Sequence, residues 1–337
     1  MTREVNFGLW YDFRNPAQQM GFEDFYTTTL EQIAWAEALG FDSVWLTEHH
    51  FVDDGYTPSP LVIAAAIAQK TKDLQIGTNL MLLPLADPIR LAEDAATLSI
   101  LSGGRFDLGV GLGYRQVEFD YFDRQLKHRP SLMEEGIDII RQAWSGKPVN
   151  HEGLRFQVDN LTVAPVPPTL PRLLMGGMVE PAIARAARLG DGFLSTGGIG
   201  HAEYIQALDA AGRPRSEGAI FAGHWAVISA DPEKEATLIG DYALYQINQY
   251  IKWGAFGPPD QTPEFASPAD ALRDGLYEMH DGNSAVTALT LLLNEYPEIK
   301  DVHFWAQFPG EPFEQGNARI EYMAKNVLPR VREQITH

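Results

Sequence analysis

Short apolar segments alternate with amphipathic helical segments along the chain. The apolar segments have the length of buried strands, and eight follow one another: 5–11, 43–48, 74–83, 105–112, 172–175, 192–196, 220–229 and 302–308. Between them, apolar residues recur at helical spacing, and Ser-Pro or Asp-Pro pairs mark helix starts at 59–60, 87–88, 231–232 and 267–268. Eight consecutive strand–helix units favour a (β/α)8 barrel over an open, doubly wound sheet.

Two stretches interrupt the alternation. Residues 149–163 have a hairpin-like pattern before the fifth strand, and residues 254–267 form an irregular insertion. A dinucleotide-binding open sheet would have G-x-G-x-x-G after its first strand, and none follows Tyr11. We therefore predict an α/β fold with one barrel domain over residues 1–337 and an insertion at 254–267.

The fourth predicted strand is unusual on the face that points to the barrel axis. Successive strand residues face opposite sides, so Asp107, Gly109, Gly111 and Gly113 share the axial face. Three glycines remove the bulky side chains that normally fill a barrel. The pattern indicates either a flat, wide ligand against this strand or close packing of the strands themselves.

Polar side chains stand near the C-terminal ends of the second and third predicted strands, where such barrels have their active sites. His49 shares the axial face with Trp45 and Thr47, and Asn79 lies on the next strand. The ordinary pKa range of histidine suits acid–base catalysis, which makes His49 a candidate catalytic residue. A hydrogen-bonded structural histidine is the alternative.

A metal site is not expected at Glu48-His49-His50. Adjacent residues on a strand diverge to opposite faces, so His49 and His50 cannot easily share one ion. The sequence contains no Cys, no H-x-H and no H-E-x-x-H. A nucleophilic serine in a G-x-S-x-G turn is also absent from the sequence.

Gly176-Gly177-Met178 lies between the fifth strand and the helix that begins near Glu180. Glycines before a helix expose backbone N–H groups, and the helix dipole adds positive potential there. The turn is thus a candidate phosphate site, although many strand-to-helix loops are rich in glycine.

Charge and composition exclude several other classes of function. The chain has 26 basic and 45 acidic residues, a formal net charge of −19, so we expect no nucleic-acid partner and no membrane association. Without Cys there are no disulfides, thiolate metal sites or cysteine nucleophiles. No signal segment is evident at the N-terminus, and the apolar runs are too short to span a bilayer, which predicts a cytoplasmic protein.

The residues from 45 to 119 resemble the bacterial luciferase-like flavin-dependent monooxygenases. The likeness rests on E-H-H-F at 48–51, D-P-I-R at 87–90 and G-G-R-F-x-L-G-V-G at 103–111. It also rests on an I-G-T-x-x-x-L-P pattern at 76–84, which has one additional residue before the Leu-Pro pair in this chain. PRLLMGGMVEPAIARAARLGDGFLS and NVLPRVRE resemble later parts of the family. This resemblance implies a (β/α)8 barrel with a flavin at its C-terminal mouth.

The resemblance also implies roles for particular residues. His49 matches a histidine implicated in proton transfer, and Asn79-Leu80 matches a pair beneath the flavin ring where the family often has a non-prolyl cis peptide. The flavin phosphate would be bound by the matching glycine turn and an arginine: Gly176, Gly177, Met178 and Arg129. Gly111-Leu112 departs from the Cys-Arg of luciferase itself, so Gly111 would contact the flavin without a thiol, and light emission is not predicted.

The expected function is that of a two-component monooxygenase. Reduced FMN from a separate flavin reductase would react with O2, and the flavin hydroperoxide would oxygenate a small organic substrate such as an aldehyde, a ketone or a similar apolar compound. Aromatic residues near the mouth are candidates for the substrate pocket: Trp10, Tyr11, Trp45, Phe51 and Trp305. The insertion at 254–267 is a candidate lid.

Two other functions fit the same barrel. One is an F420-dependent oxidoreductase that transfers hydride, and the other is a non-catalytic flavin-binding protein.

The segment 61–68 is apolar nearly all round, and relatives commonly pair early barrel helices, so a homodimer is expected.

Overall fold

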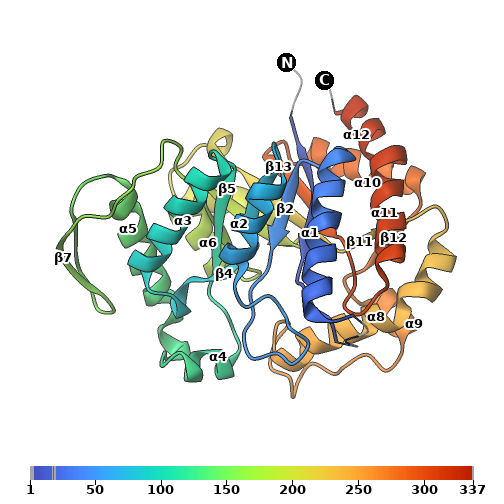
Figure 1. Ribbon diagram of the computed structural model, residues 1–337, viewed down its shortest axis with the longest axis horizontal. Helices are drawn as coiled ribbons and strands as arrows, with labels where there is room; N and C mark the ends of the chain where they lie inside the picture. The colour runs from blue at the N-terminus through green and yellow to red at the C-terminus, as the bar shows by residue number, and fades with distance from the viewer. Residues whose placement is uncertain (1–3, 17, 19, 336–337) are drawn as a thin grey trace.

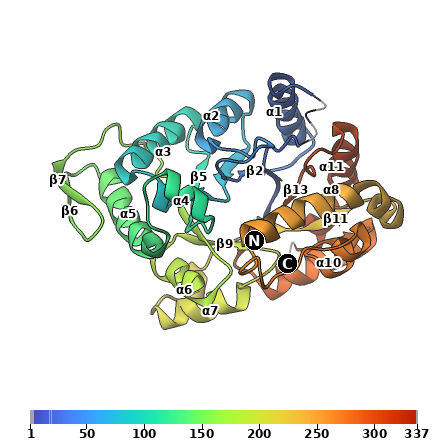
Figure 2. The ribbon, with the colours of Figure 1, turned by 90° about the horizontal axis from the view of Figure 1, so that it is seen from below.

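The computed structural model describes residues 4–16, 18 and 20–335, and its centre is a closed parallel β-barrel (Figure 2). The barrel strands are β1 (Asn6–Tyr11), β2 (Ser43–Leu46), β3 (Gln75–Thr78), β5 (Phe106–Gly111), β8 (Leu173–Gly176), β9 (Gly192–Thr196), β10 (Ile220–His224) and β13 (Ile299–Trp305). Each pairs in parallel with its neighbours, and β13 closes the barrel against β1. The predicted (β/α)8 barrel is confirmed.

Helices surround this barrel (Figures 1 and 2). The outer layer contains α1 (Phe22–Ala38), α2 (Pro60–Lys70), α3 (Pro88–Ser102), α5 (Arg129–Trp144), α6 (Glu180–Leu189), α7 (His201–Ala210), α10 (Gly282–Glu295), α11 (Phe313–Asn326) and α12 (Leu328–Gln334). At the lower end in Figure 1, where the strands have their C-terminal ends, lie α4 (Gln116–Tyr121), α8 (Pro232–Trp253) and α9 (Pro268–Asp274).

The Ser-Pro and Asp-Pro pairs begin helices as predicted. In α3 the Asp87 carboxylate accepts the backbone N–H groups of Ile89 and Arg90, and Pro88 occupies the first turn, where no N–H is needed. Asp231 caps α8 in the same way, and Gly254 ends that helix in the left-handed conformation, which favours glycine.

The third and seventh strands are shorter than the sequence predicts. The chain leaves β3 after Thr78, passes through a cis Asn79–Leu80 peptide bond and continues as β4 (Met81–Leu82). The segment predicted as the seventh strand divides into β10 and β11 (Ala226–Ile228). β11 pairs with β12 (Glu278–His280) instead of with the barrel, so an apolar run that looks continuous serves two sheets.

The last strand also differs from the prediction in its limits, and helices lie near both ends of the described chain. β13 begins at Ile299, three residues before the predicted start. The sequence does not show this part of the strand because Lys300 and Asp301 interrupt the apolar pattern, although Asp301 is buried. Near the N-terminus, the first helix begins at Phe22. Near the C-terminus, the helical region is divided into α11 and α12 at Val327.

The two irregular stretches lie outside the barrel. Residues 149–163 contain the predicted hairpin, made by β6 (Val149–Glu152) and β7 (Gln157–Leu161), which projects at the left of Figure 1. Residues 254–267 contain neither helix nor strand. No helix in the described part of the chain is both long enough and apolar enough to cross a membrane.

Buried apolar side chains form two main clusters. The larger fills the space between the barrel and its helices. The second includes the aromatic residues Trp10, Trp45, Phe221, Trp225 and Trp305 together with the inner face of α8. This aromatic cluster brings α8 and the insertion against the C-terminal end of the barrel, where a cavity opens.

Candidate active site

A cavity of about 400 Å³ occupies the C-terminal mouth of the barrel. Its wall is formed by residues at the ends of the barrel strands, by Tyr250 of α8 and by Gly254, Ala255, Phe256 and Gly257 of the insertion. Both its size and its place in the fold are typical of small-molecule sites in (β/α)8 barrels. The insertion therefore forms part of the cavity wall.

Nine predicted site residues line this one cavity. They are His49, Asn79, Leu80, Arg129, Gly176, Gly177, Met178, Trp10 and Trp305. Trp10 and Trp305 stack on each other with ring centroids 4.3 Å apart, and the indole N–H of Trp10 donates to the Asn79 carbonyl oxygen. The stacked pair gives the cavity a flat apolar wall.

Gly111, which is predicted to contact the flavin, is not among the residues that line the cavity. A Cβ on Gly111 would lie 2.5 Å from the side chain of Leu80, and one on Gly176 would lie 2.6 Å from it. Leu80 therefore fills the slot between these two glycines and itself lines the cavity. A Cβ on Gly109 would meet the Thr78 carbonyl oxygen at 1.9 Å, so this glycine allows close packing of strands.

Three aromatic residues predicted for the substrate pocket also lie elsewhere. Trp45 is fully buried deeper in the barrel, because the absence of a side chain at Gly77 leaves room for its ring there. Phe51 is 53% exposed and packs on Tyr121 outside the cavity. Tyr11 follows Trp10 on β1 and thus points outward, into the cluster beneath the helices.

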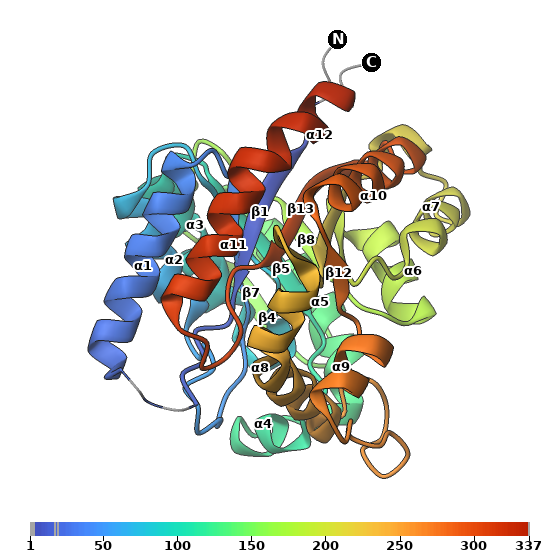
Figure 3. The ribbon, with the colours of Figure 1, turned by 90° about the vertical axis from the view of Figure 1, so that its right-hand side faces the viewer.

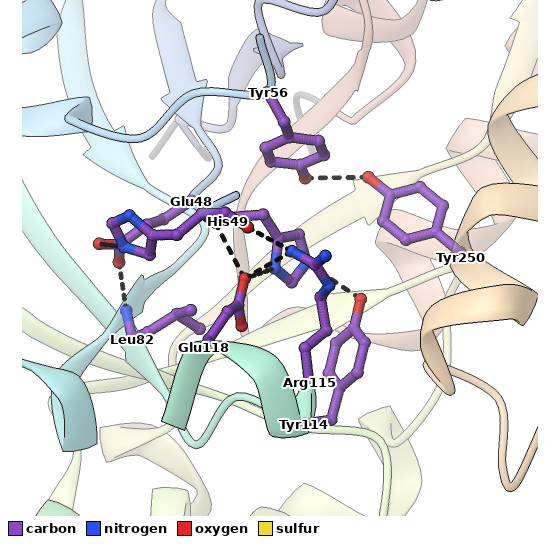
Figure 4. Close-up of polar contacts among 9 residues, drawn as sticks. Glu48, His49, Tyr56, Leu82, Tyr114, Arg115, Glu118 and Tyr250 are labelled. Carbon is purple, nitrogen blue, oxygen red and sulfur yellow. Dashed lines mark hydrogen bonds and ion pairs between the residues drawn. The ribbon is translucent and has the colours of Figure 1, made fainter. Parts of the chain in front are cut away.

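His49 lies in a buried hydrogen-bonded network at the cavity wall (Figure 4). Its Nδ1 is 2.9 Å from Oε1 of Glu118, and its Nε2 is 3.0 Å from the hydroxyl of Tyr114. Oε1 of Glu118 also accepts the His50 backbone N–H and Nη1 of Arg115, each at 2.9 Å. The short helix α4 supplies Glu118 and thereby fixes the imidazole.

The pKa shifts in this network follow from burial and pairing. Burial lowers the pKa of His49 below its usual value, although the Glu118 carboxylate acts in the opposite direction. Burial alone would raise the pKa of Glu118, but hydrogen bonds from His49 and His50 and the charge of Arg115 lower it. The site therefore holds a neutral imidazole beside an ionised carboxylate at neutral pH.

Tyr114 and Glu118 were not predicted as site residues from the sequence. Both lie in the stretch after the fourth predicted strand, with no distinctive spacing to His49, which is 65 and 69 residues away. Only the fold brings them together. A signal did exist in the position of Tyr114, since it follows directly on the glycine-rich strand end at the barrel mouth.

His49 and His50 lie beyond the end of β2, and their imidazoles bind different carboxylates. Nε2 of His50 is 3.0 Å from Oε1 of Glu48, whose other oxygen accepts the backbone N–H of Leu82. This arrangement ties the end of β2 to β4. Within the described residues, no group of three or more His, Asp or Glu side chains is placed to hold a metal ion.

A second buried histidine lies deeper in the barrel. Nδ1 of His303 is 2.8 Å from Oδ1 of Asp301, and its Nε2 is 2.9 Å from the side-chain amide of Asn79. The Trp45 indole N–H donates to the same Asp301 oxygen at 3.0 Å. This network positions Asn79, which lines the cavity floor next to Leu80.

The opposite side of the cavity suits an anion. Gly176, Gly177 and Met178 lead into α6, whose first backbone N–H groups have no partners within the helix. Glu134, just over one turn into α5, binds Arg185, just over one turn into α6, so the two helix N-termini lie at the same level. The guanidinium of Arg129, at the start of α5, makes no hydrogen bond or ion pair with the described residues, although the backbone N–H of Arg129 donates to the Leu126 carbonyl oxygen.

These features fit a flavin. The cavity offers a helix N-terminus and an unpaired arginine for a phosphate, a floor formed by Leu80 and Asn79, and an aromatic wall for a ring system. A Cβ on Gly177 would approach Cβ of Ala182 to 2.4 Å, so this turn can be tight only with glycine. Arg115, bound to Glu118 and the His50 carbonyl, is not available to a phosphate.

The sequence is similar to those of known flavin-dependent and F420-dependent enzymes. The model of the luciferase-like monooxygenase family matches residues 5–296. An F420-dependent glucose-6-phosphate dehydrogenase of Amycolatopsis mediterranei is 32% identical over 217 residues, which cover 61% of this chain and 63% of that protein. The oxygenase component of a flavin-dependent trigonelline monooxygenase of Acinetobacter baylyi is 28% identical over 165 residues, or 48% and 46% of the two chains.

The solved structures agree with the fold. The oxygenating constituent of 3,6-diketocamphane monooxygenase of Pseudomonas putida, in complex with FMN, superposes with a TM-score of 0.77 at 19% identity, covering 97% of this chain and 98% of that one. The chain spans about half the length of the curated relatives it matches. Since the family model covers most of the sequence, this chain belongs to the luciferase-like monooxygenase family.

Proposed function

We propose that this chain is the oxygenase component of a two-component monooxygenase. Reduced FMN, delivered by a separate reductase, would bind in the cavity and supply electrons to dioxygen, and one oxygen atom would pass to a small organic substrate such as an aldehyde or a ketone. A trigonelline monooxygenase oxygenase component among the relatives and an FMN complex among the structural neighbours support this proposal.

The single observation that carries the proposal is the pairing of two features in one cavity. An unpaired Arg129 beside the N-terminus of α6 can anchor a phosphate at one end. A buried His49 held by Glu118 can take up or release a proton at the other. The apolar wall between them excludes water from the reacting atoms.

Charge near the phosphate end favours FMN over F420. F420 has an acidic tail beyond its phosphate, which calls for additional cations. Arg185 and Arg188 on α6 are both paired with Glu134, and the net charge of the chain is −19. The F420-dependent hydride-transfer reaction stays the second candidate, supported by the relative from Amycolatopsis mediterranei.

Anaerobic titration tests this choice of cofactor. Quenching of tryptophan fluorescence should give tighter binding of reduced FMN than of reduced F420, because Trp10, Trp225 and Trp305 line the cavity. Air is then admitted in the presence of octanal, a flavin reductase and NADH, and the carboxylic acid is quantified. Tighter binding of F420, with hydride transfer and no oxygen uptake, would favour the second candidate.

We also propose that the chain forms a homodimer through α2 and α3. These neighbouring helices expose Val62, Ile100 and Leu101, which are 72%, 43% and 49% accessible. Light scattering at micromolar concentration should give twice the mass of the chain, and Val62→Glu together with Leu101→Glu should give the monomer.

A further inference from the structure

Tyr114 is a polar side chain of the cavity wall that the flavin and His49 assignments leave unused. Its hydroxyl is 3.0 Å from Nε2 of His49, and the two rings meet edge to face with centroids 5.3 Å apart. Tyr114 and His49 both line the cavity, whereas Glu118 lies behind them and is fully buried. The three side chains thus form a line that leads from the cavity into the protein (Figure 4).

The hydrogen-bond partners determine which atom donates the proton in each bond along this line. Oε1 of Glu118 accepts from Arg115 and from the His50 backbone N–H, both of which require an acceptor. An ionised carboxylate only accepts, so Nδ1 of His49 must carry the proton of the bond between them. The neutral imidazole then has a bare Nε2, and the Tyr114 hydroxyl donates to it.

We propose that Tyr114 is the terminal group of a Tyr114–His49–Glu118 proton relay that exchanges a proton between the cavity and the imidazole. This inference rests on the proposed function, for which it names the group that touches the reacting atoms. A proton on a cavity oxygen passes to the Tyr114 oxygen while the Tyr114 proton passes to Nε2 of His49. The phenol is re-formed, and the imidazolium faces the Glu118 carboxylate. The reverse transfer returns the proton, so no oxidant or reductant is needed.

The surroundings of His49 support a relay that rests in its neutral form. The titratable groups around the imidazole are Glu48, Tyr56, Tyr114, Arg115 and Glu118. Burial raises the pKa of the Tyr114 phenol well above its usual value, so the phenol keeps its proton when the relay is at rest. Tyr56 also touches the His49 ring, but its hydroxyl is bonded to the Tyr250 hydroxyl at 3.0 Å.

Tyr114→Phe and Tyr56→Phe form a matched pair of variants. Each removes one buried hydroxyl beside His49, and only Tyr114 is bonded to Nε2. In 15N NMR of the ligand-free chain labelled at histidine, His49 should show a protonated Nδ1 and a bare Nε2. Tyr114→Phe should move the Nε2 resonance downfield, whereas Tyr56→Phe should leave it in place. A protonated Nε2 in the wild type, or an unmoved resonance in Tyr114→Phe, would overturn the relay.

A kinetic measurement tests the use of the relay. In single turnovers with reduced FMN, oxygen and octanal, Tyr114→Phe should be slower by about 10²-fold or more and should lose its solvent deuterium isotope effect, with FMN affinity unchanged. Wild-type rates in this variant would contradict the proposal. If the wild type itself does not oxygenate octanal, the proposed function fails, and the NMR result still decides whether the relay exists.

Discussion

Two histidine–carboxylate pairs lie at different depths in the same barrel. His49 is paired with Glu118, and His303 is paired with Asp301, in both cases through Nδ1 at 2.9 Å or less. Nε2 of His49 meets the Tyr114 hydroxyl at the cavity wall, whereas Nε2 of His303 meets the Asn79 side chain, and His303 is fully buried. The same pair of groups is suited to proton transfer where it reaches the cavity and to positioning where it is enclosed.

We expect replacement of His49 to reduce the rate of oxygenation and replacement of His303 to reduce stability. His49→Gln should reduce single-turnover oxygenation by about 10²–10⁴-fold, because an acid–base group is lost while the fold is retained. Rapid-mixing kinetics measures the rate, and His151→Gln on the remote hairpin serves as the control. Equal rates in His49→Gln and the wild type would show that the imidazole has no part in the chemistry.

His303→Leu should act mainly on stability. The substitution leaves the buried Asp301 carboxylate without its imidazole partner, and breaking a buried pair in this way lowers the free energy of unfolding by about 3–5 kcal/mol. Urea denaturation measures the change. His280→Gln removes a much more exposed pair and should change that free energy by less than about 1 kcal/mol. Similar losses in both variants would contradict the distinction.

Two further histidines show how burial changes the pKa of an imidazole that is not bonded to a carboxylate among the described residues. Burial lowers the pKa of His201 and of His224 to about 4 in the folded chain. Between that value and the ordinary pKa near 6.5, the unfolded chain binds more protons than the folded chain, so stability falls as the pH falls through this window.

The expected loss is up to about 3 kcal/mol for each of these two histidines. Urea denaturation between pH 7 and pH 4 checks it. The slope of stability against pH should be smaller in His201→Gln than in the wild type, and an unchanged slope would show that His201 is not responsible.

The smallest expected effect concerns the floor of the cavity. Gly111→Ala should displace the Leu80 side chain, because the new Cβ would lie 2.5 Å from it. FMN binding should weaken about tenfold, which corresponds to about 1.4 kcal/mol. Fluorescence titration measures the affinity. Gly21→Ala is the control, since nothing lies within 4 Å of its new Cβ. Unchanged affinity in Gly111→Ala would mean that Leu80 does not set the floor.

The barrel could be predicted from the sequence because its strands and helices follow local patterns. Helix starts with Asp-Pro are set by backbone capping within a few residues. The limits of β13 could not be predicted, since Asp301 looks like a surface residue until Ser43, Trp45 and His303 surround it. A buried polar group depends on partners that are distant in sequence.

The candidate site shows the same division. His49 and Gly177 could be chosen because a strand end and a glycine turn have fixed places in such barrels. Glu118 could not, because its role depends on how the short helix α4 folds back over the end of β2. The glycines of β5 stand out in the sequence, where they indicate either a flat ligand or close strand packing; in the structure Gly111 accommodates Leu80 and Gly109 accommodates a neighbouring strand.

A crystal structure of the chain with FMN tests the central claim most directly. We expect the flavin ring above Leu80 and Asn79, the phosphate at Gly176-Gly177 with Arg129 beside it, and the Tyr114 hydroxyl facing the ring or a bound substrate analogue. A flavin bound outside this cavity, or a phosphate far from the start of α6, would contradict it.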